Sequence, residues 1–103
     1  MDALVISRAV LLKIRDKHGL SRSDVEECFS NIEKGFLIDD REQHKTNPQT
    51  QWFIAENNTG KKIKIVFIFT TDEEGSAKVI LKSAYVANST EMAIYESNAQ
   101  ALN

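Results

Sequence analysis

The sequence is poor in the residue types that build many common functional sites. Its 103 residues include one cysteine, one proline and four glycines. The lone cysteine, Cys28, excludes an intramolecular disulfide and a site in which several cysteines bind a metal ion. Because the four glycines are scattered singly, a glycine-rich phosphate-binding loop is excluded as well. The two histidines lie far apart, so no cluster of metal ligands is evident, and we expect neither a metal nor another cofactor.

The chain also lacks an excess of positive charge and a long apolar run. Its 13 Lys and Arg residues stand against 15 Asp and Glu residues, for a formal net charge of -2. A protein that binds nucleic acid mainly by neutralising phosphates has a basic surplus, so any such affinity must come from a local cluster of basic residues here.

The N-terminal residues match neither a signal peptide nor a membrane span. We therefore expect one cytoplasmic domain, residues 1–103, with no membrane association.

Three segments are predicted to be helical, because apolar residues recur in them at helical spacing and a capping residue precedes each. They begin after Ser7, after Ser21 or Ser23, and after Asn88. The second segment is expected to end at Gly35. Its positions i, i+3, i+4 and i+7 hold Val25, Cys28, Phe29 and Ile32.

The remaining segments are predicted to be strands. Short apolar runs cover residues 3–6, which are a candidate edge strand, and residues 36–38; longer ones cover 51–56, 61–70 and 77–86. Turn signals at residues 57–60 and 72–76 separate the longer runs. The order predicts an α+β fold in which two N-terminal helices and one C-terminal helix pack on a four-stranded antiparallel sheet.

A period of two assigns faces to the last two strands. In residues 61–70, the side chains expected to pack on the helices are Ile63, Ile65, Phe67 and Phe69. In residues 77–86, the face opposite Val79, Leu81 and Tyr85 carries Lys78, Lys82 and Ala84. A basic patch is therefore predicted on the outer face of the sheet, formed by Lys62, Lys64, Lys78 and Lys82. Such a patch suits an anionic ligand; a charged outer face is also what a one-sided sheet needs in water.

Further candidate site residues lie in the polar loop before the first long strand and in that strand itself. His44 lies in a polar loop with Arg41 and Lys45, where an imidazole suits general acid–base chemistry and the cations extend the basic patch. Trp52 and Phe53 are neighbours in a strand and point to opposite faces. One of the two is expected in the core and the other beside the lysines, where it would stack on a nucleic-acid base. The spacing alone does not say which.

Two other residues have polar rings. Tyr85 is a candidate phenolic acid or stacking platform. His18 precedes a helix-ending glycine, where an imidazolium interacts well with the last carbonyls, so it is interpreted as a capping or packing residue.

Several stretches together resemble the BrnT-type proteins, and the resemblance spans nearly the whole chain. They are Lys17-His18-Gly19-Leu20-Ser21, the helix with Asp24-Val25-Glu26-Glu27-Cys28-Phe29, Gly60-Lys61-Lys62, Lys82-Ser83-Ala84-Tyr85-Val86-Ala87, and Glu91 with Tyr95-Glu96. BrnT proteins are toxins of type II toxin–antitoxin systems. They are RelE-like ribonucleases neutralised by a DNA-binding antitoxin.

The resemblance implies a RelE-like fold, an RNA substrate, a cognate antitoxin as partner, and metal-independent attack of the 2′-hydroxyl on the adjacent phosphate. The implied catalytic residues are Lys62, Lys64, Lys82 and Tyr85, with His44 as the other candidate for proton transfer. Arg41, Lys45, Trp52 and Lys78 would bind RNA. The alternative is a non-catalytic interaction module with a degenerate toxin fold, which would hold a protein or small anionic partner through Trp52, Tyr85 and residues 41–45.

Overall fold

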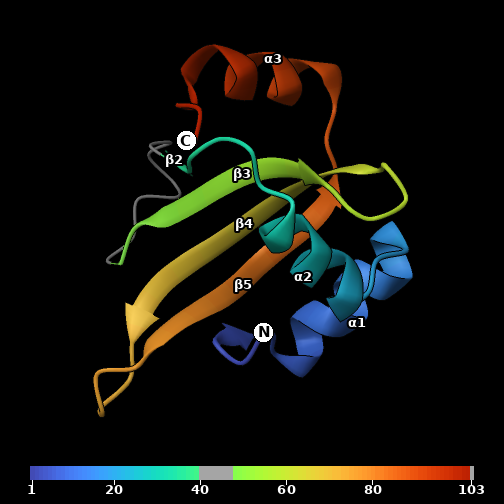
Figure 1. Cartoon of the computed structure of the whole chain (residues 1–103). Helices are drawn as coiled ribbons and strands as arrows, with labels where there is room; N and C mark the ends of the chain where they lie inside the picture. Colours follow the sequence, from blue (N-terminus) through green and yellow to red (C-terminus); the bar gives the residue numbers. More distant parts are fainter. Residues whose placement is uncertain (40–47, 103) are drawn as a thin grey trace.

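The computed structural model of the chain is an α+β fold with three helices and a five-stranded mixed sheet (Figure 1). The structure describes residues 1–39 and 48–102. The elements in chain order are β1 (Leu4–Val5), α1 (Arg8–His18), α2 (Arg22–Ser30), β2 (Leu37–Ile38), β3 (Thr50–Glu56), β4 (Lys62–Thr71), β5 (Ala77–Val86) and α3 (Ser89–Asn98). Two N-terminal helices and one C-terminal helix are therefore confirmed. No helix in the described part of the chain has the length and apolar character needed to span a bilayer.

The four-stranded antiparallel sheet predicted from the sequence is wrong in strand number and in direction. The strand order is β1-β5-β4-β3-β2, and β1 runs parallel to its neighbour β5. The backbone N–H of Val79 donates to the carbonyl of Ala3 at 2.8 Å. Parallel pairing is open to β1 because helices α1 and α2 and three strands separate it from β5, whereas strands joined by short turns must run antiparallel.

The helices begin where the sequence predicts, because polar side chains satisfy their first free N–H groups. The Ser7 hydroxyl accepts from the N–H of Val10, and Ser21 and Asn88 each form a reciprocal capping box. Helix α2 ends at Ser30, not at Gly35 as predicted. Gly35 instead pairs with the C-terminal tail, since its N–H donates to the carbonyl of Gln100 at 2.7 Å.

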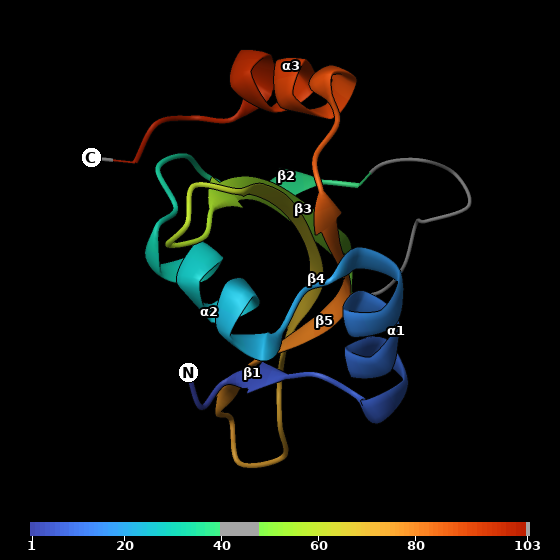
Figure 2. The same cartoon turned by 90° about the vertical axis from the view of Figure 1, so that its right-hand side faces the viewer.

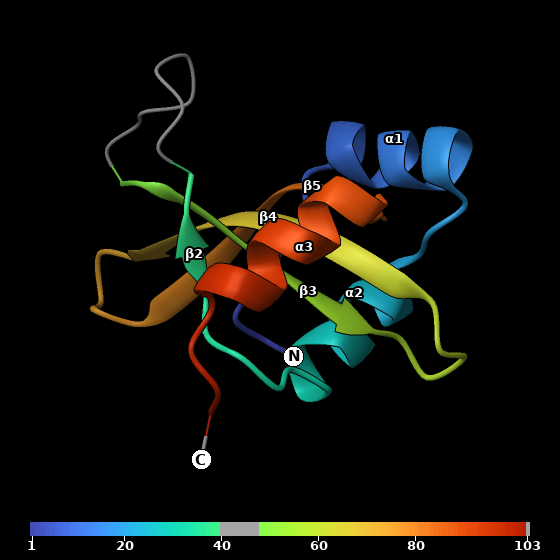
Figure 3. The ribbon, with the colours of Figure 1, turned by 90° about the horizontal axis from the view of Figure 1, so that it is seen from above.

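Helices α2 and α3 lie on opposite faces of the sheet. The ring of Phe53 packs 4.8 Å from Phe29 of α2, whereas its neighbour Trp52 packs 5.8 Å from Tyr95 of α3. Adjacent residues of a strand point to opposite faces, so these contacts place one helix on each side. The sheet curves around α2, and α3 lies across its outer side (Figures 2 and 3).

The predicted face assignment holds for most of β4 and fails at the end of β4 and in the second half of β5. Ile63, Ile65 and Phe67 are buried as predicted. Phe69 is 49% exposed, because β3 accompanies β4 only as far as Ile68 and leaves the end of β4 uncovered. Along β5, Val79, Leu81 and Ala84 are all buried, which a strict period of two does not allow.

A shift of register in β5 explains this change of face. Val66 pairs with Ser83 and Phe67 pairs with Leu81, so Lys82 between them has no partner on β4. One unpaired residue reverses the alternation beyond it, as in a β-bulge. As a consequence, Tyr85 pairs with Lys64 and lies on the same face as that lysine. The alternation in the sequence had assigned Tyr85 to the face of Leu81.

The turn between β3 and β4 is organised by one buried side chain. The Oδ1 atom of Asn57 accepts from the N–H and hydroxyl of Thr59 and from the N–H of Lys61, at 2.9 to 3.1 Å. Its Nδ2 donates to Asp24 of α2 at 3.0 Å. Asn57 is only 5% exposed, so water cannot readily replace these partners. This residue fixes the turn and joins it to α2.

Replacing this asparagine should therefore destabilise the fold. We expect Asn57→Ala to lower the free energy of unfolding by roughly 2 kcal/mol, because the four hydrogen bonds of this buried side chain are lost together. Urea denaturation measures the change. Asn58→Ala is the matched control, since the exposed Asn58 side chain accepts one hydrogen bond, from Asn31 at 3.0 Å. Equal losses for the two variants would contradict this role of Asn57.

Candidate functional site

Four side chains meet between the outer face of the sheet and the first turn of α3, and we call them the Lys64 cluster: Trp52, Lys64, Tyr85 and Glu91. The ammonium of Lys64 lies 2.9 Å from Oε2 of Glu91, and the Tyr85 hydroxyl donates to the same oxygen at 2.8 Å. The ammonium also lies 4.5 Å from the ring centroid of Trp52 and 5.6 Å from that of Tyr85. One phenol hydroxyl and two aromatic rings thus surround one cation–carboxylate pair.

The sheet register brings the first three members together. Lys64 lies on β4 between Ile54 of β3 and Tyr85 of β5, and Trp52 lies two residues from Ile54 on the same face. The one-residue shift at Lys82 is what turns Tyr85 toward Lys64. Three neighbouring strands therefore each contribute one side chain.

Helix α3 supplies the fourth member through its cap. Asn88 and Glu91 form a capping box, in which the N–H of Asn88 donates to Oε1 of Glu91 at 3.0 Å. The other carboxylate oxygen, Oε2, points to the sheet and accepts from Lys64 and Tyr85. The same carboxylate therefore begins the helix and joins it to the sheet.

Burial and hydrogen bonding set the charge states of the cluster. The side chains of Lys64 and Glu91 are 10% and 16% exposed. Burial by itself raises the pKa of Glu91, but hydrogen bonds from Asn88, Lys64 and Tyr85 outweigh it and hold that pKa below the ordinary 4.5. Burial, followed by the hydrogen bond to Glu91, raises the pKa of Tyr85. At neutral pH the cluster therefore presents a carboxylate and a protonated phenol.

The cluster has the geometry of an anion-binding site. An ammonium and a phenol converge on one negatively charged oxygen, and charge-assisted hydrogen bonds of this kind are the strong ones. A pocket of about 390 Å³ adjoins the cluster and is lined by both Lys64 and Trp52, with Ile94 and Asn98 of α3 among its walls. A ligand in this pocket would be in reach of the ammonium.

An imidazole lies at the other side of the cluster. The ring of His18, at the end of α1, is 5.8 Å from the ring of Tyr85 and tilted by 42°. The sequence assigned His18 to capping or packing, and its packing on Tyr85 agrees with that assignment. The contact also places an imidazole beside the phenol, which the sequence did not indicate.

The structure does not gather the four lysines of the predicted basic patch in one place. Lys64 is buried under α3 and paired with Glu91. Lys62 and Lys82 are exposed, and among the described residues neither side chain has a hydrogen bond or an ion pair. Lys78 pairs with Asp72 in the β4–β5 turn at 4.0 Å. Of the candidates, Lys64, Tyr85 and Trp52 are brought together.

Three further candidates, Arg41, His44 and Lys45, lie outside the described residues. Trp52 is the ring that lies beside a lysine, as one of the pair Trp52 and Phe53 was expected to do. Both rings are buried, however: Phe53 is 0% exposed against α2, and Trp52 is 9% exposed because α3 covers the outer face. A nucleic-acid base cannot stack on Trp52 while α3 remains in place.

Glu91 is the member of the cluster that the sequence did not single out as a site residue. A signal for its position exists, because Asn88 followed three residues later by Glu91 matches a capping box. That signal places the carboxylate at the start of the helix. It does not show that the helix folds back onto Lys64.

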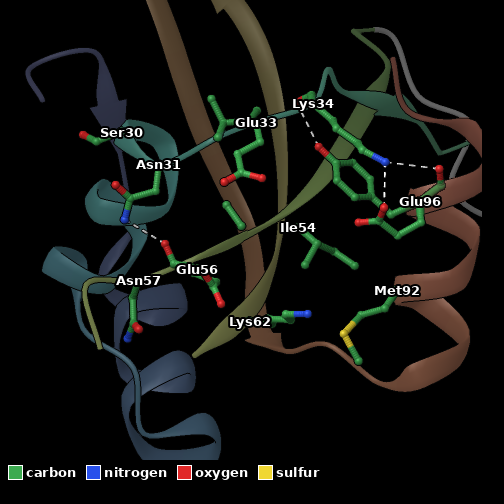
Figure 4. Close-up of a pocket in the computed structure, with 13 residues that line it drawn as sticks. Ser30, Asn31, Glu33, Lys34, Ile54, Glu56, Asn57, Lys62, Met92 and Glu96 are labelled. Atoms are coloured by element: carbon green, nitrogen blue, oxygen red, sulfur yellow. Dashed lines mark hydrogen bonds and ion pairs between the residues drawn. The ribbon is translucent and has the colours of Figure 1, made fainter. Parts of the chain in front are cut away.

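A larger pocket, of about 650 Å³, lies between β3, α3 and the chain that follows α2 (Figure 4). Lys34 and Glu96 form an ion pair of 2.7 Å at its wall, and Glu33, Glu56 and Lys62 also line it. The lining carries both signs of charge and therefore does not select an anionic ligand. The Tyr95 hydroxyl closes one side: its oxygen lies 2.9 Å from the carbonyls of both Lys34 and Gly35, which share its one O–H as acceptors.

Within residues 1–39 and 48–102, no group of three or more His, Cys, Asp or Glu side chains is placed to hold a metal ion. Comparison with known proteins found no family model and no curated protein that matches the chain.

The lowered pKa of Glu91 predicts a pH-dependent contribution to stability. We expect Glu91→Gln to cost roughly 2 kcal/mol at neutral pH, because it leaves a buried ammonium without its counter-charge. Since the folded-state pKa is depressed, the contribution is complete above the ordinary value of 4.5 and is lost as the pH falls through the lower folded value. Denaturation of wild type and variant across this range measures the difference.

The matched control is Glu96→Gln, which removes an exposed carboxylate from the same helix. Its effect at neutral pH should be smaller than that of Glu91→Gln. A wild-type advantage over Glu91→Gln that stays constant from about pH 7 to about pH 3 would contradict the assignment.

Proposed function

We propose that the chain is a BrnT-like toxin-family protein with a RelE-like fold, which cleaves RNA at the Lys64 cluster without a metal ion. One observation carries the proposal: Lys64 and Tyr85 converge on a single anionic oxygen, at 2.9 and 2.8 Å. A non-bridging phosphate oxygen resembles a carboxylate oxygen in charge and in its demand for donors. The same two side chains would therefore hold an RNA phosphate in place of Glu91.

The arrangement of elements supports the proposed fold. Two helices precede the long strands, a terminal helix follows them, and the candidate residues lie on the central strands. The parallel strand β1 is an addition to the antiparallel sheet that the resemblance implies. It lies at the far edge of the sheet, next to β5, and therefore leaves the cluster unchanged.

The chemistry of the cluster suits transesterification. In that reaction the 2′-oxygen bonds to phosphorus and the bond from phosphorus to the 5′-oxygen breaks, which leaves a 2′,3′-cyclic phosphate and a 5′-hydroxyl. Lys64 would stabilise the negative charge that builds up on the phosphorane oxygens. Tyr85, whose raised pKa keeps it protonated, would donate its proton to the departing 5′-oxygen.

The reaction also needs a base for the proton of the 2′-hydroxyl. His18 is the imidazole next to Tyr85, and the predicted candidate His44 lies outside the described residues. Lys62 and Lys82, both exposed, would contribute contacts to the RNA backbone. The protein partner would be a cognate antitoxin.

A second candidate function is a non-catalytic interaction module. It is favoured by the pairing of Lys64 with Glu91, because a neutralised, buried lysine can serve only to hold α3 on the sheet. The chain would then hold a protein or a small anionic partner through Tyr85, Trp52 and residues 41–45. RNA cleavage separates the two candidates.

Removal of the two converging donors should abolish cleavage. We expect Tyr85→Phe to lower the rate by about 100-fold or more, because the leaving oxygen loses its acid. Lys64→Met should lower it by a similar factor through loss of charge stabilisation. The measurement is cleavage of purified RNA in a ribosome-free assay with a chelator present, with mass spectrometry of the new ends.

Lys13→Met is the matched control, because Lys13 is an exposed lysine of α1 far in the sequence from the cluster. It should cleave at the wild-type rate. Full cleavage by both Tyr85→Phe and Lys64→Met would exclude this site.

Expression in bacteria tests the toxin assignment. Induction of the wild-type chain should arrest growth and accelerate RNA decay, and Tyr85→Phe, which keeps the ring and removes only the hydroxyl, should do neither. Growth curves and RNA half-lives measure these effects. Growth arrest that persists undiminished in Tyr85→Phe, without RNA decay, would favour the interaction module.

A further inference from the structure

We infer that α3 is an intramolecular competitor for the Lys64 cluster, in which Glu91 occupies the position of an RNA phosphate oxygen. The inference rests on the proposed function and adds a means of regulation to it. The folded chain contains the site, but Glu91 closes it. RNA binds only when the first turn of α3 moves away.

The hydrogen-bonding capacity of Tyr85 gives the first argument. A phenol has one O–H to donate, and that of Tyr85 is donated to Oε2 of Glu91 at 2.8 Å. The hydroxyl therefore cannot donate to a phosphate while Glu91 is bound. The ammonium of Lys64 donates one of its three N–H groups to the same oxygen, and the rings of Trp52 and Tyr85 lie against it.

The unequal attachment of the two ends of α3 gives the second argument. The far half is anchored by the buried Tyr95, which bonds to two carbonyls and packs on Trp52, and by the ion pair of Glu96 with Lys34. In the first turn, Ser89 and Thr90 are exposed, so Glu91 supplies the polar attachment of this end to the sheet. Loss of that polar attachment would leave the half-buried Met92 as the packed side chain of this turn, while Tyr95 holds the rest of the helix.

The adjoining pocket gives the third argument. It is lined by Lys64 and Trp52, by Ile94 and Asn98 of α3, and by Leu37, Ile38 and Asp39, so a ligand in it lies next to the ammonium without displacing the far half of α3. A phosphate entering there would compete with Glu91 for the same donors. Its apparent affinity is then reduced by the fraction of molecules in which Glu91 is bound.

The experiment compares full-length wild type with Glu91→Gln, which keeps an oxygen for the Asn88 cap but removes the charge. The probe is a short 2′-O-methylated oligoribonucleotide, which cannot be cleaved. Trp52 is the only tryptophan and lies 4.5 Å from the Lys64 ammonium, so its fluorescence reports binding. We expect Glu91→Gln to bind at least about tenfold more tightly than wild type.

The matched control is Glu73→Gln, which makes the same change of charge in the exposed β4–β5 turn, away from the cluster and from α3. We expect its affinity to stay within about twofold of wild type. Equal affinities for Glu91→Gln and Glu73→Gln would overturn the inference, because the effect would then be one of overall charge. A loss of affinity in Glu91→Gln would overturn it too.

Hydrogen exchange of the wild-type chain covers the case in which Glu91→Gln fails to fold. Saturating probe should accelerate exchange of the backbone amides of residues 91–92 at the start of α3. Unchanged or slower exchange there would overturn the inference.

Cleavage of unmodified RNA separates this inference from the proposed function. Tighter binding by Glu91→Gln with no cleavage by either protein supports the competitor and refutes the ribonuclease. Cleavage by wild type, with no gain in affinity for Glu91→Gln, supports the ribonuclease and refutes the competitor. Absence of binding by all three proteins refutes both.

Discussion

One carboxylate links the helical and sheet parts of the candidate site. Glu91 accepts from the N–H of Asn88 through one oxygen and from Lys64 and Tyr85 through the other. Removing either partner would leave the other charge in surroundings that are mostly closed to water, which is more costly than breaking an exposed surface pair. The position of α3, the burial of Trp52 and the charge states of the site all follow from this contact.

The sequence predicts the local parts of the structure and misses the parts that depend on distant segments. The N-terminal ends of the three helices are predictable because capping is a short-range effect. Their capping residues are Ser7, Ser21 and Asn88. The same holds for the outward direction of Lys64, which follows from its neighbours in β4. The parallel pairing of β1 with β5 has no such signal, because it joins residues more than 70 positions apart, Leu4 and Val79.

The candidate site was predictable to a similar extent. Lys64, Tyr85 and Trp52 could be selected by residue type and spacing, but the cover formed by α3 could not, since a capping box says nothing of where a helix docks. The unpaired Lys82 had a larger effect on the predicted site than the cover formed by α3. One extra residue in β5 moved Tyr85 to the face of Lys64 and left Lys82 of the expected row without a partner on β4.

The pairing of β1 with β5 also bears on the order in which the protein acquires its structure during synthesis. Helices α1 and α2 leave the ribosome first, yet the strands on which they pack are β3, β4 and β5. Until residue 86 has emerged, Leu20, Val25 and Cys28 have no complete sheet to cover them. The native core therefore closes late. Until then the apolar side chains of α1 and α2 are in contact with water or with a chaperone.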